Sequence, residues 1–139
     1  MKTYVDTSAL IKLVVTEAET IGLKEYLREI GGDTLFTAAL SRTELIRAVR
    51  RVDAHALDVA RRVLAGVATV NLTATLLDAA ASLDPPLLRS LDAIHLAAAQ
   101  RAGADLRVVV TYDARMSEAA RLLGIPVAAP GRADPHRSA

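Results

Sequence analysis

The stretch Leu106-Arg107-Val108-Val109-Val110-Thr111-Tyr112-Asp113 decides the fold class of this chain. Its short β-branched run lacks the polar alternation of a half-exposed strand, which is typical of a strand covered on both faces, as in a parallel sheet. An acidic residue ends the run, and a helical period over residues 114–123 follows directly. A buried strand that leads into a helix is the repeating unit of an α/β domain.

The same alternation extends outward along the chain. Strand patterns are expected at residues 2–6, 35–38, 68–72 and 106–112, with an edge strand at 125–129. Helical periods follow Asp6, surround Glu44, and cover residues 23–30, 56–67, 73–83, 91–102 and 114–123. Gly31-Gly32 and Asp84-Pro85-Pro86 interrupt the helical patterns, as glycine stops and proline breaks do. The order of elements predicts an α/β sandwich.

Composition fits a small enzyme domain without selecting one. The 139 residues suffice for one core, which we place at residues 1–130, and the polar segment 131–139 is predicted to be a flexible tail. No apolar stretch approaches the ~18–20 residues of a membrane span, and no signal-peptide pattern precedes the first strand, so we expect a cytoplasmic protein. Cysteine is absent, which excludes disulfides and thiolate metal sites. With a net charge of +1, any basic contact with nucleic acid must be local.

Four acidic residues lie at junctions between a strand or loop and the predicted helix that follows it: Asp6, Glu44, Asp92 and Asp113. Each has a structural explanation when taken alone. Asp6 and Asp113 are placed to cap helices, and Asp92 lies in a first turn, where the helix dipole favours negative charge. Glu44 stands three residues after Ser41, which is the spacing of a capping box. For any single acid, such capping is the more common role.

Taken together, the positions of these acids indicate a ligand site. Asp6 and Asp113 end strands, and ligand crevices form at the carboxyl ends of the strands in an open parallel sheet. Crowded carboxylates repel one another and resist ionising unless a cation lies among them. Because all the ligands would be oxygens, the pattern favours Mg²⁺ or Mn²⁺ over softer metals.

Four ordered motifs carry a family resemblance. They are Tyr4-Val5-Asp6-Thr7-Ser8-Ala9-Leu10, Arg42-Thr43-Glu44-Leu45, Leu91-Asp92-Ala93-Ile94-His95-Leu96-Ala97, and Thr111-Tyr112-Asp113 followed by Arg115-Met116. In this order and spacing they closely resemble the PIN-domain ribonucleases, and more narrowly the VapC-type toxins of bacterial type II toxin–antitoxin pairs. The resemblance implies a three-layer α/β/α PIN-like domain with a central, mainly parallel sheet of four to five strands.

The resemblance also implies an activity, a metal-dependent endoribonuclease that acts as a toxin. The family's acids align with Asp6, Glu44, Asp92 and Asp113, which would be both catalytic residues and ligands of Mg²⁺ or Mn²⁺. We expect Asp6 and Asp92 to bind the principal ion. Glu44 and Asp113 would complete its coordination shell or hold a second ion.

The remaining implications concern supporting residues and partners. Ser8 and Thr111 match the family's hydroxyl positions near the metal, although a local capping role is equally common for such hydroxyls. The family implies an RNA substrate, a homodimer, and inhibition by a cognate VapB-like antitoxin whose tail lies across the active site; no membrane partner is expected. The apolar stripe of residues 56–67 suits either a dimer contact or the protein's own core.

Basic and aromatic residues bear on how RNA would be held. Arg42, Arg89 and Arg115 flank the acidic motifs and are candidates for bidentate contacts with phosphates, but solvated or ion-paired arginines are at least as common. Aromatic residues make up 3% of the chain, so an extended base-stacking platform is not expected. His95 follows Asp92 by three residues. Because its helix is apolar, we interpret it as a hydrogen-bonded core residue.

Three other functions are compatible with parts of this pattern. A PIN-like scaffold could bind RNA or protein without cutting, although the presence of all four acids argues against a degenerate site. A phosphoacceptor domain also gathers strand-end aspartates around Mg²⁺, but the first strand lacks paired acids and no lysine lies near the last. A DNA nuclease is also compatible with the pattern, because a metal site contacts phosphates, which RNA and DNA share, and not sugars.

Overall fold

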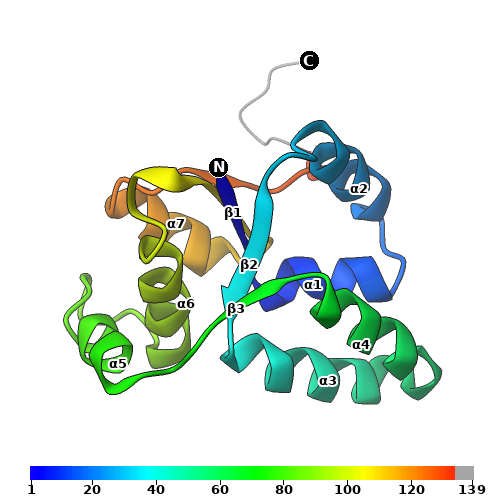
Figure 1. The fold of residues 1–139 in the computed structure, drawn as a ribbon, viewed down its shortest axis with the longest axis horizontal. Coiled ribbons are helices and arrows are strands. Elements are labelled where there is room, and N and C mark those ends of the chain that lie inside the picture. Colours follow the sequence, from blue (N-terminus) through cyan, green and yellow to red (C-terminus); the bar gives the residue numbers. More distant parts are fainter. Residues whose placement is uncertain (134–139) are drawn as a thin grey trace.

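A parallel sheet runs through the centre of the protein, in a computed structural model that describes residues 1–133 (Figure 1). Its five strands lie in the order β3-β2-β1-β4-β5, and every neighbouring pair is parallel. The strands are β1 (Lys2–Val5), β2 (Thr34–Ala38), β3 (Ala68–Val70), β4 (Leu106–Val110) and β5 (Val127–Ala128). The expected number and direction of the strands are therefore confirmed.

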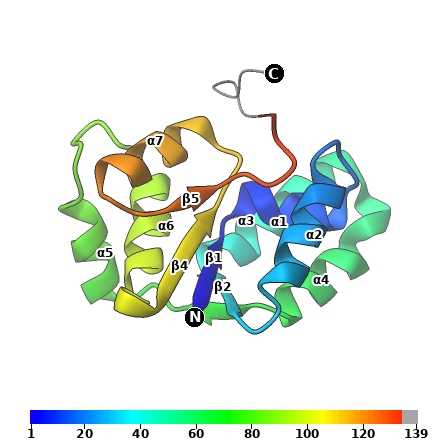
Figure 2. The same ribbon diagram turned by 90° about the horizontal axis from the view of Figure 1, so that it is seen from above.

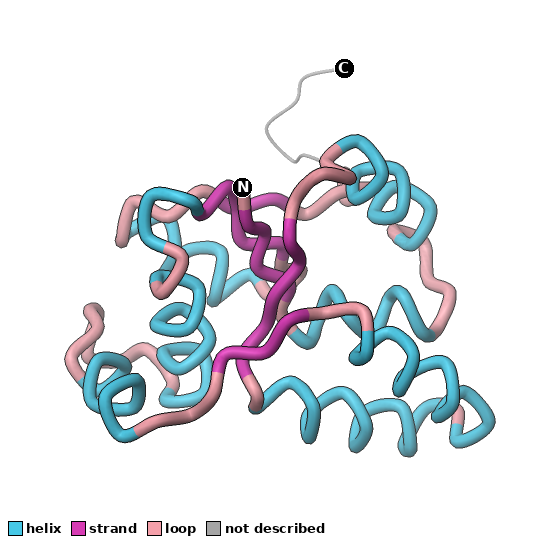
Figure 3. The backbone as a smooth tube through the Cα atoms, viewed as in Figure 1, coloured by secondary structure: helices cyan, strands magenta, loops and turns pink. Residues whose placement is uncertain are grey.

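Helices cover both faces of this sheet (Figures 1, 2 and 3). The α-helices of the described chain are α1 (Thr7–Val14), α2 (Thr20–Glu29), α3 (Leu40–Val52), α4 (Leu57–Ala65), α5 (Ala74–Ala81), α6 (Ser90–Gln100) and α7 (Ala114–Leu122). Short 3₁₀ turns, η1 (Ala54–Ala56) and η2 (Gly103–Asp105), follow α3 and α6. Helices α1–α4 lie on one face and α5–α7 on the other, so the prediction of a three-layer α/β/α domain is confirmed.

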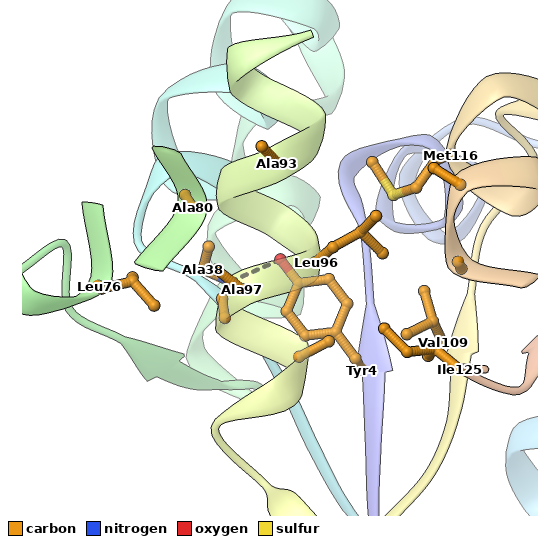
Figure 4. Packing of buried hydrophobic residues seen from close by; sticks show 14 of the residues in the cluster. Tyr4, Ala38, Leu76, Ala80, Ala93, Leu96, Ala97, Val109, Met116 and Ile125 are labelled. Carbon is orange, nitrogen blue, oxygen red and sulfur yellow. Dashed lines mark hydrogen bonds between the residues drawn. The ribbon is translucent and has the colours of Figure 1, made fainter. Parts of the chain in front are cut away.

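The alternation of side chains along the strands divides the core into two parts. Tyr4 and Val109 pack with α5, α6 and α7, as Figure 4 shows for one cluster. Val5, Val108 and Val110 point the other way and pack with α1–α4. Because both faces are buried, these strands read in the sequence as continuous apolar runs.

The order of the strands places a switch point between β1 and β4. From β1 the chain proceeds to β2 and β3 on one side, then crosses back to β4 and continues to β5 on the other side. Helices after β1 and after β4 therefore leave toward opposite faces, which opens a crevice at the carboxyl ends of these two strands. Asp6 directly follows β1, and the segment Thr111–Asp113 directly follows β4.

Several expected boundaries shift by one or two residues. The strand expected at 106–112 ends at Val110, and that expected at 68–72 ends at Val70. The helix expected at 56–67 is α4, and its stripe, including the buried Ala60 and Leu64, packs into the protein's own core. Thr73 caps α5 as expected, because its side chain accepts the N–H of Leu76 at 3.2 Å.

The chain after β5 contacts the body of the protein before the described residues end. Gly131, at φ 82°, lies against the backbone of Glu19, and a side chain at Gly22 would meet the Gly131 backbone at 2.6 Å. Arg132 donates to the carbonyl of Tyr112 at 2.7 Å. Residues 134–139 of the predicted tail lie outside the described residues. No helix within residues 1–133 has the length and apolar character that crossing a membrane requires.

Candidate active site

Asp6 is a buried carboxylate at the switch point. Its side chain accepts hydrogen bonds from the Ser8 hydroxyl at 2.6 Å, from the Ala9 N–H at 3.1 Å, and from the Thr111 hydroxyl. The bond from Ala9 confirms that Asp6 caps α1. Burial raises the pKa of Asp6, and the bonds from Ser8 and Thr111 oppose that rise without cancelling it. Capping therefore accounts for one of several contacts that hold this charge in the interior.

Two hydroxyls tie the end of β4 to Asp6. Thr111 donates to Asp6 and also accepts the N–H of Asp113 at 3.1 Å. Ser8 donates to Asp6 and accepts the N–H of Tyr112 at 2.9 Å. The carboxylate of Asp113 caps α7 by accepting the N–H groups of the first residues of that helix. Ser8 and Thr111 thus hold Asp6 and the Asp113 backbone in one network.

Glu44 does not form the expected capping box. The α3 helix begins at Leu40, its N-cap is Ala39, and no side chain caps it. Helix α3 begins two residues earlier than the box requires, so Ser41 lies inside the helix, and its hydroxyl pairs with that of Thr37 at 2.6 Å. The carboxylate of Glu44 is thereby free to turn toward α1 and α6.

The contacts of Glu44 lie on two other elements. Its Oε1 accepts the Thr7 hydroxyl at 2.7 Å and lies 2.7 Å from Nε2 of His95. Burial raises the pKa of Glu44, but the bonds from His95 and Thr7 together outweigh that effect and leave the pKa lowered. Because Thr7 adjoins Asp6 in the sequence, Glu44 is drawn to the same edge of the sheet.

Asp92 lies in the first turn of α6, as expected. Burial is the main reason that the pKa of Asp92 is raised, and the negative charges of Asp113 and Glu44 raise it further. The opposing charges of His95 and Arg89 do not offset these effects. Mutual repulsion of this kind means that the carboxylates share one neighbourhood.

The residues suit a hard divalent cation in their chemistry, although the site is not closed around one. Within residues 1–133, no three His, Asp or Glu side chains lie close enough together to hold a metal ion. The four acids nevertheless supply only oxygen donors, and the pKa values of Asp6 and Asp92 are raised. A cation beside these carboxylates would lower both raised pKa values. The donor set therefore fits Mg²⁺ or Mn²⁺ once the carboxylates draw together.

His95 is a buried residue that also contacts an acid. As expected from its apolar helix, its side chain is only 3% exposed and is hydrogen-bonded. One ring nitrogen meets Glu44 and the other lies 2.5 Å from the Tyr4 hydroxyl. The sequence feature that could have indicated a role of His95 at the acidic site is its spacing of three residues from Asp92, which places both residues on one face of the helix.

The flanking arginines divide into two groups. Arg89 and Arg115 line a pocket of about 430 Å³ that also contains Asp92. Arg42 lies elsewhere, in a pocket formed by α3 and α4 together with Arg61. The structure therefore brings two of the three candidate arginines to Asp92 and leaves Arg42 apart from them.

The sequence matches a known protein family and several named relatives of similar length. The PIN domain family matches residues 3–122. Ribonuclease VapC35 of Mycobacterium tuberculosis is 44% identical over 132 residues, which cover 94% of this chain and 98% of the relative. Ribonuclease VapC46 of the same organism is 44% identical over 127 residues, which cover 91% of this chain and 96% of the relative.

A solved structure agrees on the fold. The crystal structure of M. tuberculosis VapC20, described as a sarcin-ricin loop cleaving toxin, has a TM-score of 0.69 at 21% identity and covers 84% of this chain and 94% of its own. The chain belongs to the PIN-domain family and, within that family, to the VapC-type ribonucleases.

Proposed function

We propose that this protein is an endoribonuclease that hydrolyses RNA phosphodiester bonds at the carboxyl edge of its sheet, and that it acts as the toxin of a toxin–antitoxin pair in the cytoplasm. One observation carries the proposal. Four acids lie at that edge, where the charges of Asp113 and Glu44 raise the pKa of Asp92. Within residues 1–133 no lysine or arginine forms an ion pair with any of the four. Membership of the family and the ribonuclease names of its relatives support the reaction class.

The acids would hold Mg²⁺ or Mn²⁺. Asp6 and Asp92 are proposed to bind the principal ion, while Glu44 and Asp113 complete its shell or hold a second ion. When bound, such a cation lowers the pKa of a coordinated water and stabilises charge on phosphoryl oxygens. The side chains of Asp92 and Asp113 are partly exposed, so a ligand can reach them from solvent.

The chain's own residues prepare this site. Ser8 and Thr111 engage both oxygens of Asp6 and so fix the plane of its carboxylate before any ligand arrives. Arg89 and Arg115, beside Asp92, are placed to hold the phosphates on either side of the bond that is cut. Arg42 is proposed to contact RNA at a greater distance from the acids.

The partners in this proposal are a second copy of the chain and a VapB-like antitoxin. Exposed leucines support a protein-binding surface near the acids: Leu87 is 94% exposed and Leu122 is 71% exposed, and both line the pocket that contains Asp92. Apolar side chains exposed beside a functional site commonly mark a protein interface. A partner there would also control access of RNA to Asp92.

The test is cleavage of a pool of structured cellular RNAs by antitoxin-free protein, with and without Mg²⁺ or Mn²⁺, followed by mapping of the new ends. Asp6→Asn serves as the matched control, because it removes the charge and keeps the shape. Discrete metal-dependent cuts that the variant does not make are the expected result. If the folded, metal-bound protein cuts no RNA, a binding scaffold replaces the nuclease. Faster cleavage of competing DNA would reassign the substrate.

A further inference from the structure

A chain of hydrogen bonds connects the sheet to Glu44 through His95. The backbone N–H of Ala38, at the end of β2, donates to the Tyr4 hydroxyl at 3.1 Å, a bond drawn as a dashed line in Figure 4. The same hydroxyl lies 2.5 Å from Nδ1 of His95, and Nε2 of His95 lies 2.7 Å from Glu44. The chain therefore links α6 on one face of the sheet to α3 on the other.

The direction of these bonds follows from the groups involved. The Tyr4 hydroxyl has one proton, and it accepts the amide proton of Ala38. A tyrosine hydroxyl carries its proton at neutral pH, so Tyr4 can donate to Nδ1 of His95. A ring nitrogen that accepts carries no proton, so the imidazole proton lies on Nε2 and is donated to Glu44.

This chain of hydrogen bonds from Ala38 through Tyr4 and His95 to Glu44, which we call the relay, occupies one oxygen of the Glu44 carboxylate and leaves the other available. Both the Thr7 hydroxyl and His95 reach Oε1. Oε2 has no hydrogen-bond partner among the described residues, and the Glu44 side chain is 27% exposed, whereas that of His95 is 3% exposed. Two donors on one oxygen restrict the rotation of the carboxylate and leave Oε2 without a partner in a partly exposed side chain.

We propose that His95 is a positioning residue of the active site: held in its Nε2–H form by Tyr4, it orients Glu44 so that Oε2 stays available to the divalent cation that would bind there. This inference rests on the proposed function, since it assigns a role to a helper of one proposed ligand. Partners that hold the ligands of a metal commonly affect its affinity by about 10–100-fold. The ring of Tyr4, 5.9 Å from that of His95 and nearly perpendicular to it, also restricts the imidazole from moving.

The first experiment reads the relay directly, without RNA or metal. Long-range ¹H–¹⁵N NMR of the full chain separates a protonated ring nitrogen from an unprotonated one. We expect His95 to show an unprotonated Nδ1 and a protonated Nε2, and Tyr4→Phe to remove that preference. His55, which is exposed on η1, provides an internal reference from a histidine without such partners. A proton on Nδ1 in the wild-type protein overturns the relay.

The second experiment asks whether His95 acts through Glu44. Affinity for Mn²⁺ is measured by calorimetry and cleavage by kcat and KM, for His95→Leu, Glu44→Gln and the double variant. His95→Leu should weaken Mn²⁺ binding and lower kcat by about 10–100-fold, with little change in KM for RNA. In the Glu44→Gln background the same change should have no further effect on Mn²⁺ affinity. Equal losses in both backgrounds overturn the role.

Two further variants separate positioning from packing. His95→Gln keeps an N–H donor near the position of Nε2 and should recover much of the Mn²⁺ affinity that His95→Leu loses. His55→Gln should leave both affinity and kcat unchanged. If His95→Leu does not fold, the NMR result and Tyr4→Phe still decide the proposal. A wild-type protein that shows the expected tautomer but binds no Mn²⁺ and cuts no RNA overturns the proposed function and leaves the hydrogen-bond relay standing.

Discussion

Two aspartates at opposite ends of the sheet differ in how their charges are balanced. Asp33, just before β2, has a side chain that is 4% exposed and accepts from Arg107 at 2.6 and 3.1 Å and from Thr3 at 3.0 Å, and the N-terminal amine lies 3.5 Å away. The bonds from Arg107 are the main reason that the pKa of Asp33 is lowered to about 2. Asp6, at the other end, has a raised pKa and no basic ion-pair partner among residues 1–133.

This difference separates a charge that the protein neutralises itself from one that is suited to a ligand site. The chain satisfies Asp33 completely from its own residues, so that charge ties β2, β4 and the N-terminus together. At the carboxyl edge the acids are close enough for their charges to raise the pKa of Asp92. An arrangement that costs stability in this way is expected where a ligand completes it.

The largest expected effect on RNA cleavage comes from removing the charge of Asp6 at the carboxyl ends of the strands. Asp6→Asn should reduce RNA cleavage by more than about 100-fold, because loss of a ligand exceeds the 10–100-fold typical of its outer partners. Its thermal unfolding midpoint should stay near the wild-type value, since burial already opposes the charge that is removed. Initial cleavage rates and a thermal melt check both parts. Retained cleavage by this variant would remove Asp6 from the site.

The second prediction concerns divalent cation and folding. Mn²⁺ at 100 times its dissociation constant should stabilise the wild-type protein by about 2.7 kcal/mol, because it binds the folded state only. Asp6→Asn should lose this increment, while Asp33→Asn should keep it. Urea unfolding with and without Mn²⁺ measures the difference. An equal increment in all three proteins would place the cation away from the carboxyl edge.

The third prediction concerns how the contribution of Asp33, at the amino ends of the strands, to folding stability depends on pH. The folded pKa of Asp33 is lowered to about 2, and the unfolded value is about 3.9. Because the folded state releases its proton more readily, the contribution of Asp33 is fully present above about pH 4 and is lost as pH falls toward about 2. Wild-type protein should therefore be more stable than Asp33→Asn near neutral pH, and the two should converge in this acid window. Urea midpoints across the pH series provide the measurement.

Cleavage provides the control for that series. Asp33→Asn should cut RNA at the wild-type rate at neutral pH, because Asp33 lies at the end of the sheet opposite the acids. A large loss of cleavage with unchanged stability would mean that the two ends are not independent. No convergence at low pH would mean that Asp33 does not carry the ion pair that the structure shows.

The sequence predicted most of the fold because its strands are buried on both faces. The run Val108–Val110 and the helical period after it identified β4 and α7 to within two residues. The four acids were located by their position at strand and helix ends. Their shared network was less accessible, because the bond from Thr111 to Asp6 joins residues that are 105 positions apart. Local spacing also misassigned Glu44, since Ser41 three residues earlier suggested a cap that tertiary contacts with Thr7 and His95 replace.

The smallest expected effect concerns the arginines beside the acidic edge. Arg89→Gln and Arg115→Gln should each weaken RNA binding and reduce the salt slope of log K by about 1, as expected for loss of one phosphate contact. Arg42→Gln should have a smaller effect on cleavage, because Arg42 lies in a different pocket from Asp92. RNA affinity measured for Asp6→Asn protein, over a range of salt concentrations, isolates binding from cutting. If Arg42→Gln changes the slope as much as Arg115→Gln does, the RNA path must extend over α3 and α4, and the carboxyl edge would be one part of a longer basic groove.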